Sequence, residues 1–451
     1  MNKNLFLTGL ALFISSMASY GAQVDSGLIQ QGEYLARAGD CVACHTAVGG
    51  KPFTGGLAIK SPIGLIYSTN ITPDPAQGIG GYSLEEFGNA VRQGVRKDGR
   101  TLYPAMPYPS YSRLSDDDVK ALYAYFMHGV EADSTVNKET EIPWPLSMRW
   151  PLRIWRGLFA PEAKPFNAQT YSDPQVARGS YLVQGLGHCG SCHTPRGMAM
   201  QEKALTEQQG EHWLAGGTVI DGWSVPNLGA DHYNGLGSWS EDEIVAYLKT
   251  GRTDRTASFG PMTDVISWST QYLTDKDLHA IAKYLKTLPV SKTADKEVVA
   301  SNTTSPAGEA IYQDNCAICH GRQGEGIARM FPQLRGNSIV TGPLPDSLVK
   351  IIREGATLPA GNWAPSTVSM PAYADQFSSQ QTADLINYLR GAWGNHSSTS
   401  VTAQDVEQII RDGGNAGAGN TAGWTFMQAQ PYGKQWTFQI ESHHDAHDNA
   451  K

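Results

Sequence analysis

Apolar residues recur at helical spacing in three similar segments that lie far apart along the chain. The segments are 114–125, 273–284 and 377–388, and they align with one another. Each has Ser or Thr at its second position and Asp or Gln three residues later, which is the pattern of a helix N-cap with a capping box. These pairs are Ser115 with Asp118, Thr274 with Asp277, and Ser378 with Gln381. The pattern predicts three similar helices, each with one buried face.

The first two of these helices follow segments that also resemble each other. Residues 70–94 align without a gap on residues 227–251. The matching positions are Asn70, Gly78, Gly80, Ser83, Glu86 and Gly94 with Asn227, Gly235, Gly237, Ser240, Glu243 and Gly251. The third unit has Phe331–Asn337 and an amphipathic stretch, Leu348–Glu354, in place of this segment. Self-similarity of this kind indicates a repeat architecture, in which the first two units are a duplication.

All six cysteines lie in three copies of one motif, Cys-x-x-Cys-His. In this motif both thiols form thioethers with a haem, and the histidine is the proximal iron ligand. A thioredoxin-like site needs neither the histidine nor three copies, and a zinc site needs two more ligands near each pair. The motifs therefore predict three covalently bound haem c groups. The thioether residues are Cys41, Cys44, Cys189, Cys192, Cys316 and Cys319, and the proximal ligands are His45, His193 and His320.

A short helical run, starting near Gly32, Gly179 or Gly308, precedes each motif. Two small helices that cross over a haem form the cytochrome c fold. We therefore predict a mainly α protein with three consecutive cytochrome c-type haem domains, because 451 residues exceed one compact core. The expected boundaries are 24–140, 168–292 and 300–396, with a Trp/Pro-rich connector at 141–167 and a C-terminal tail at 397–451.

The two ends of the chain and its net charge indicate where the protein is expected and which partners it is expected to have. Residues 1–22 have Lys3 near the start, a short apolar stretch and small residues near Ala22, which is typical of an export signal peptide. The protein is therefore expected outside the cytoplasm. The net charge of −8 argues against a nucleic-acid partner and against a polybasic contact with anionic lipid. His443, His444 and His447 are interpreted as part of a solvated tail rather than a metal site.

A second axial ligand decides whether a haem site is closed for electron transfer or open for chemistry. One methionine precedes the closing helix of each unit and adjoins a proline: Met106, Met262 and Met370. Proline favours an extended loop, and the shared position predicts iron ligation by these three residues. Met330 is a weaker rival to Met370. His188 is either a rival ligand or a residue beside a haem edge.

Several segments resemble the cytochrome c subunits of membrane-bound bacterial dehydrogenases for alcohol, gluconate, sorbitol and fructose. These are Ser68–Asp74, Gly78–Ser83, Asp98–Tyr108 and Ile142–Pro151, and the resemblance extends over roughly residues 25–395. It implies that the chain relays electrons from a large flavoprotein or quinoprotein subunit to ubiquinone, at the periplasmic face of the cytoplasmic membrane. It also implies the axial pairs His45/Met106, His193/Met262 and His320/Met370, and a small third subunit as a further candidate partner.

Two other functions remain open from the residues alone. A multihaem peroxidase-like enzyme would need one open iron site, and a soluble multihaem electron shuttle would have no fixed partner. The connector, with three Trp and four Pro in residues 141–161, is either an interface or intra-chain packing between the first two domains. Neither the substrate nor the organic cofactor of a partner follows from the sequence.

Overall fold

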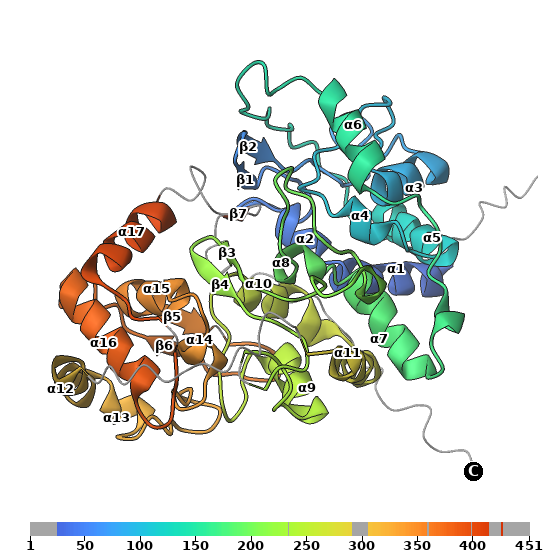
Figure 1. The fold of residues 1–451 in the computed structure, drawn as a ribbon. Helices are drawn as coiled ribbons and strands as arrows, with labels where there is room; N and C mark the ends of the chain where they lie inside the picture. The colour runs from blue at the N-terminus through green and yellow to red at the C-terminus, as the bar shows by residue number, and fades with distance from the viewer. Residues whose placement is uncertain are drawn as a thin grey trace, which may run out of the picture.

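The structure is a computed structural model that describes residues 25–290, 305–414 and 425–426, except residues 233, 359 and 398. The expected signal peptide at 1–22 and the histidine-rich end of the chain lie outside these residues. The fold is mainly α, as the sequence predicts, and the strands are short. Figure 1 shows three groups of helices along the chain, with the second group between the other two.

The first unit and the connector contain the following elements: α1 (Ser26–Ala38), α2 (Cys41–Cys44), β1 (Ala58–Ser61), β2 (Gly64–Tyr67), α3 (Leu84–Gln93), α4 (Tyr108–Tyr111), α5 (Asp116–Ala124), the π-helix η1 (Tyr125–Gly129) and, in the connector, α6 (Trp150–Phe159). Strands β1 and β2 form an antiparallel hairpin in which Ala58 pairs with Tyr67. The short strand β7 (Thr425–Phe426) pairs antiparallel with the other edge of β1.

The second unit repeats this order: η2 (Ala168–Thr170), α7 (Pro174–Gln184), α8 (Gly190–His193), η3 (Glu207–Gln209), β3 (Thr218–Ile220), β4 (Trp223–Val225), α9 (Glu241–Thr250), α10 (Pro261–Trp268), η4 (Thr270–Tyr272) and α11 (Asp275–Thr287). Strands β3 and β4 form the counterpart of the first hairpin, with Thr218 paired to Val225. The equivalent elements support the duplication that the sequence predicts.

The third unit contains α12 (Pro306–Asn315), α13 (Ala317–His320), α14 (Ser338–Thr341), α15 (Asp346–Glu354), β5 (Ala356–Leu358), β6 (Val368–Met370), α16 (Ser379–Gly391) and α17 (Ala403–Gly414). Its hairpin, β5 with β6, follows α15 rather than preceding it, and pairs Ala356 with Met370. Helix α17 packs against α15 and α16. None of the helices in the described ranges is long and apolar enough to cross a membrane.

A glycine lies where the first helix of each unit crosses the closing helix of that unit, which is α5, α11 or α16. A Cβ atom on Gly32 would lie 2.0 Å from the carbonyl oxygen of Ala121, and one on Gly179 would lie 1.9 Å from that of Ala280. In the third unit the corresponding distance, from Gly308 to Asp384, is 2.1 Å. The prediction that the helices start near these glycines is wrong for Gly32 and Gly179, which lie inside α1 and α7. Their role is close helix contact.

The predicted N-caps of the three closing helices are confirmed. Ser115, Thr274 and Ser378 each accept a hydrogen bond from the backbone N–H three residues later. Of these three closing helices, α16 alone has the complete capping box, at Ser378 with Gln381. The prediction of a complete box is wrong for Asp118 and Asp277, because their carboxylates instead accept hydrogen bonds from side chains of α1 and α7.

One hydrogen bond at each of these aspartates crosses between the first two units, and the two bonds are equivalent in the repeat. The Tyr34 hydroxyl on α1 donates to Asp277 Oδ2 (2.7 Å), and the Tyr181 hydroxyl on α7 donates to Asp118 Oδ2. The backbone N–H of each cap residue, Thr274 or Ser115, donates to the same tyrosine oxygen at 3.3 Å. The two units therefore meet across a local pseudo-twofold axis.

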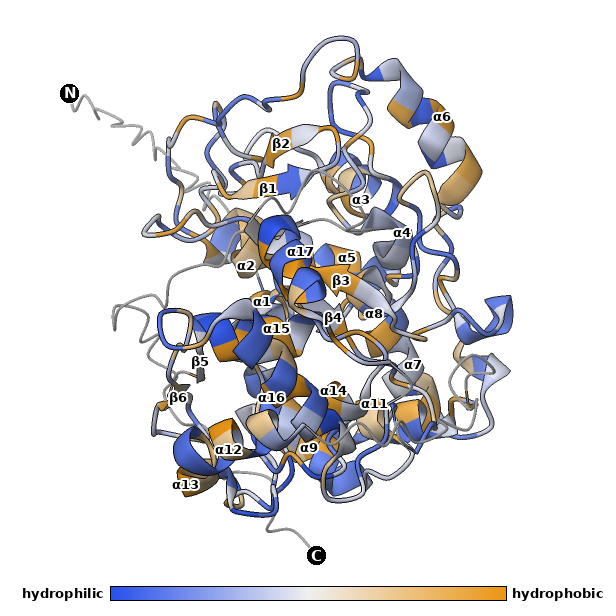
Figure 2. Ribbon diagram, turned by 60° about the vertical axis from the view of Figure 1, so that its left-hand side comes forward, coloured by the Kyte–Doolittle hydropathy of each residue, from blue (hydrophilic) through white to orange (hydrophobic). Residues whose placement is uncertain are grey.

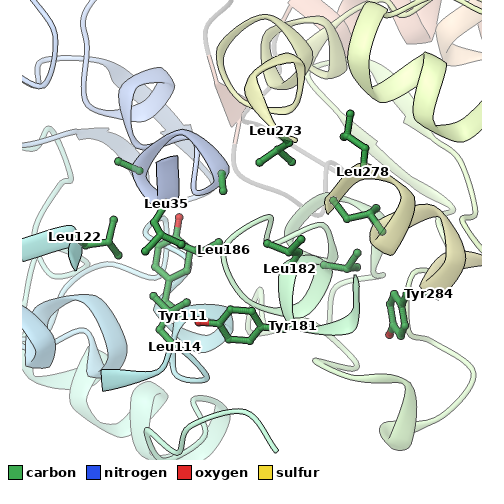
Figure 3. Close-up of a cluster of buried hydrophobic side chains, with 14 of the residues drawn as sticks. Leu35, Tyr111, Leu114, Leu122, Tyr181, Leu182, Leu186, Leu273, Leu278 and Tyr284 are labelled. Atoms are coloured by element: carbon green, nitrogen blue, oxygen red, sulfur yellow. The ribbon is translucent and has the colours of Figure 1, made fainter. Parts of the chain in front are cut away.

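The first and second units also share one apolar core. Figure 3 shows Leu35, Leu114 and Leu122 of the first unit beside Leu182 and Leu186 of the second, with the cluster continuing to Leu278. Leu114, Leu182, Leu186 and Leu278 are each at most 2% exposed. The third unit has a core of its own, which includes Val349, Leu385 and Ile386. Burial of apolar area is the main stabilising term in folding, so the first two units are expected to be stable only together.

The described contacts between the second and third units include several hydrogen bonds. Ser347 Oγ accepts from the Ser224 backbone N–H (2.9 Å), and Lys350 Nζ donates to the carbonyl of Asp221 (2.8 Å). The Trp363 indole N–H donates to the carbonyl of Gln271 (3.0 Å).

Three candidate haem-binding sites

The three motif histidines have the same local geometry. In each motif a single helical turn places the histidine after the second cysteine, and its ring turns toward a backbone carbonyl. The Nδ1 atom of His45 lies 2.6 Å from the oxygen of Thr69, that of His193 2.9 Å from Pro226, and that of His320 2.8 Å from Pro332. A carbonyl only accepts, so Nδ1–H donates and the lone pair is on Nε2.

This contact prepares each imidazole to bind a metal. A fixed Nδ1–H bond sets the ring orientation and increases the basicity of the ligating nitrogen. Burial lowers the pKa of His45, His193 and His320, although the carbonyl contact opposes this effect. The neutral form, which coordinates iron, is therefore favoured.

The six cysteines form no disulfides. Burial raises the pKa of the Cys41 and Cys189 thiols to about 12, and that of Cys192 and Cys316 to about 11. The same cause raises the pKa of Cys44. Within the described ranges no group of three or more His, Cys, Asp or Glu side chains is arranged to hold a metal ion, which does not suit a zinc site. The paired cysteines, each followed by a histidine, fit the thioether chemistry of haem attachment.

A large cavity opens beside the third motif. Its volume is about 340 Å³, and its walls include Cys316, Cys319 and His320 on one side and Met370, from β6, among the others. Residues 256–259 of the second unit form part of the lining, next to apolar residues of α15 and α16. A mostly apolar cavity with a few fixed polar groups is typical of a cofactor site. The residues present fit a haem, with His320 and Met370 as axial candidates.

The cavity also distinguishes the two methionines that are candidates for the second iron ligand in the third unit. Met370 lines it, whereas Met330 is 52% exposed and is absent from its walls. Met106 is partly buried against the core that the first two units share, as are Cys41 and Cys189. Met262 lies in the first turn of α10, so the expected extended loop is wrong at this site. Proline is favoured at the first position of a helix, which accounts for the difference.

The first and second motifs lie close to each other. Cys44 and Cys192 line one small cavity together with His188 and with Trp155 of α6. His188 is partly buried, its Nδ1 contacts the carbonyl of Leu186 at 2.7 Å, and its ring meets Tyr111 edge-on at 5.7 Å between centroids. The structure therefore places His188 between two cysteine motifs.

The carbonyl partners of the histidines were not identified from the sequence. Thr69 and Pro226 each precede the aligned pair Asn70 and Asn227, so the repeat held a signal for both positions. Pro332 lies in the Phe331–Asn337 segment that replaces this part of the repeat in the third unit.

Comparison with known proteins gives a consistent result. The family model for cytochrome c matches three ranges, 29–129, 176–289 and 305–393. The cytochrome c subunit of a quinone-type alcohol dehydrogenase from Gluconacetobacter polyoxogenes is 53% identical over 93% of this chain and 92% of its own length. The gluconate 2-dehydrogenase cytochrome c subunit of Pantoea cypripedii is 51% identical over 86% of this chain and 91% of its own.

A more distant relative has a similar description. The fructose dehydrogenase cytochrome subunit of Gluconobacter japonicus is 39% identical over 86% of this chain and 83% of its own length. The matched ranges each include one Cys-x-x-Cys-His motif, and the similarity covers most of the chain. The chain belongs to the cytochrome c family, whose members bind haem c covalently, and is an electron-transfer protein related to dehydrogenase cytochrome subunits.

Proposed function

We propose that this chain is the three-haem electron-transfer subunit of a membrane-bound dehydrogenase complex at the periplasmic face of the cytoplasmic membrane. It takes electrons from a large catalytic subunit with flavin or pyrroloquinoline quinone, which oxidises a sugar, sugar acid or alcohol, and passes them to ubiquinone. A small third subunit is a further candidate member of the complex. The observation that supports this most directly is the triple occurrence of one site geometry in a single chain, since three one-electron sites form a relay.

In this proposal the chain's own residues hold and tune each site. When bound, haem supplies a one-electron iron couple. The cysteine pairs would fix its position, and His45, His193 and His320 would offer Nε2 to the iron, because a carbonyl holds Nδ1 of each ring. Met106, Met262 and Met370 would supply the second iron ligand, which would exclude small molecules from the iron and raise its potential relative to ligation by two histidines.

Contacts between the units support a relay order with the second site in the middle. Cys44 and Cys192 line a common cavity, which brings the first and second motifs together. Residues 256–259 of the second unit line the cavity of the third motif.

The axial pairs are tested by replacing each methionine with leucine in the holoprotein. Met370→Leu is expected to change the absorption spectrum of one haem and lower its potential, because a ligand is lost. Met330→Leu is the matched control and should change neither. A shift with Met330→Leu but not with Met370→Leu would contradict the assignment. Met106→Leu and Met262→Leu are compared in the same way with Met148→Leu, a methionine of the connector that is 38% exposed.

The complex itself is tested by gentle isolation from membranes. Co-purification with a large polypeptide that contains flavin or pyrroloquinoline quinone, and reduction of a ubiquinone analogue on addition of its substrate, are the expected results. Recovery of the chain alone in the periplasmic wash would favour the soluble shuttle instead. Carbon monoxide binding to one haem of the wild-type protein would favour a peroxidase-like enzyme.

A further inference from the structure

Helix α6 presents an apolar stripe to solvent. Trp150, Ile154 and Leu158 recur every fourth residue, which places them on one face, and they are 63%, 55% and 71% exposed. Trp144, in the turn before the helix, is 81% exposed. Large apolar side chains gathered on one exposed surface mark an interaction site. We call these four residues the α6 stripe.

The opposite face of α6 is attached to the protein. The Trp155 indole N–H donates to the carbonyl of Ala199 (2.7 Å), and its ring meets that of Tyr108 at 6.3 Å. The Arg149 guanidinium lies 4.0 Å from the centre of the Tyr103 ring. Intra-chain packing between the first two units is therefore confirmed for Trp155, whereas the α6 stripe does not pack within the chain and its role as an interface stays a prediction. Figure 2 shows α6 at the edge of the molecule, with hydrophobic and hydrophilic residues along it.

The local charge around α6 favours a lipid surface over a protein partner as the occupant of the exposed face. Residues 142–161 contain three arginines and no acidic residue, although the whole chain has a net charge of −8. Arg153 is exposed between Trp150 and Ile154. A helix with Trp, Leu and Ile on one side and arginine beside them is typical of helices that lie in the interface of an anionic bilayer. The overall charge argued against contact with anionic lipid, but the local charge of this segment favours it.

We propose that α6 and the turn before it lie in the surface of an anionic phospholipid bilayer, with the α6 stripe among the acyl chains and Arg153 at the headgroups. The inner face of the same helix lines the cavity of Cys44 and Cys192, through Trp155 and Phe159. Attachment through α6 therefore places the first two motifs next to the lipid, where a lipid-soluble quinone is found. This last consequence rests on the proposed function, whereas lipid binding does not.

The test is flotation of the full-length holoprotein with vesicles, without any quinone. Vesicles of phosphatidylglycerol and phosphatidylcholine should bind it more tightly than vesicles of phosphatidylcholine alone. The variant W150S/I154S/L158S should bind at least about tenfold more weakly, because three inserted apolar side chains are lost. Arg153→Glu should bind severalfold more weakly to the anionic vesicles only. The control is Ile410→Ser on α17, which is 40% exposed and far from α6 in Figure 1, and should bind as wild type does.

Three outcomes would overturn the proposal. In the first, the triple variant floats with the vesicles as well as wild type does. In the second, it loses the catalytic subunit during purification while it still binds vesicles, which would make the stripe a protein interface. In the third, wild type is a dimer in solution and the triple variant a monomer with unchanged vesicle binding. Reduction of a water-soluble quinone analogue by the triple variant, at the wild-type rate, distinguishes failure of lipid attachment from failure of the relay.

Discussion

The junction between the first and second units differs in kind from that between the second and third. At the first junction leucines from both units fill one core. Two tyrosine–aspartate hydrogen bonds, related by a pseudo-twofold axis, also join the units. At the second junction the described contacts include several hydrogen bonds, such as that from the Ser224 backbone to Ser347. A shared apolar core couples two units in folding, whereas polar surface contacts join units that are stable separately.

The two tyrosine–aspartate contacts are themselves unequal. Asp277 also accepts two hydrogen bonds from Arg178, at 2.9 and 2.7 Å. At the repeat-equivalent place the first unit has Gln31, which donates to Asp118 Oδ1 at 3.3 Å. At this junction the second unit therefore has an ion pair, between Arg178 and Asp277, where the first unit has a neutral donor, Gln31, beside Asp118.

The largest effect is expected from the shared core. Leu182→Ala should reduce the free energy of unfolding by about 2–5 kcal/mol, since a buried leucine leaves a cavity. Hydrogen exchange measured by mass spectrometry should then become faster in α1 and α5 as well as in α7 and α11. Leu385→Ala, which is equally buried in the third unit, is the matched control and should affect that unit only. Protection of α1 that is unchanged in Leu182→Ala would refute a common folding unit.

A smaller effect is expected at the aspartates. Asp277→Asn should cost about 2 kcal/mol, because Arg178 loses its charged partner. Asp118→Asn should cost about 1 kcal/mol, because its partners are neutral. Denaturant unfolding of the holoproteins measures both. Equal losses would show that the ion pair adds nothing to the junction.

The same aspartate predicts a dependence on pH. Burial alone would raise the pKa of Asp277, but the hydrogen bonds from Arg178 and Tyr34 outweigh it and hold the pKa below its usual value. A group with a lowered pKa in the folded protein stabilises it at higher pH, and this stability is lost as the pH falls through that value. The first junction should therefore weaken below about pH 4. Asp277→Asn should lose less stability than wild type between pH 7 and pH 3, and a parallel decline would contradict the prediction.

The smallest effect is expected at the second junction. Ser347→Ala removes the acceptor of the Ser224 N–H and should cost about 1 kcal/mol. Faster exchange should be confined to β4 and α15, which meet there. Exchange that also increases in α1 would show that the third unit is coupled to the shared core.

The sequence predicted the parts of this molecule that depend on local chemistry. Ser115, Thr274 and Ser378 were identified as caps because an N-cap bond spans three residues. The third unit's axial candidates, His320 and Met370, line one cavity, and their ligation of iron stays a prediction. The contacts of Asp118 and Asp277 were not predictable in this way, because their partners are 63 and 243 residues away and only the packed units bring them together.

The sequence also did not determine whether a residue lies in a loop or on a helix, or which way its side chain faces. Met262 follows a proline, and proline is compatible both with an extended loop and with the first turn of a helix. Nothing in the neighbouring residues distinguished the two. The division of the connector into a packed face and an exposed stripe also required the structure, because Trp155 and Trp150 are the same residue type and differ only in the direction they face.

The glycines at the three helix crossings have a consequence for inherited variation in this chain. A side chain at Gly32, Gly179 or Gly308 would overlap a main-chain oxygen that cannot move without separating the two helices. Even alanine, the mildest missense change, is therefore expected to be a loss-of-function allele at these three codons. Random mutagenesis of the gene should recover no functional replacement at any of them, whereas the exposed surface of α17 should accept many.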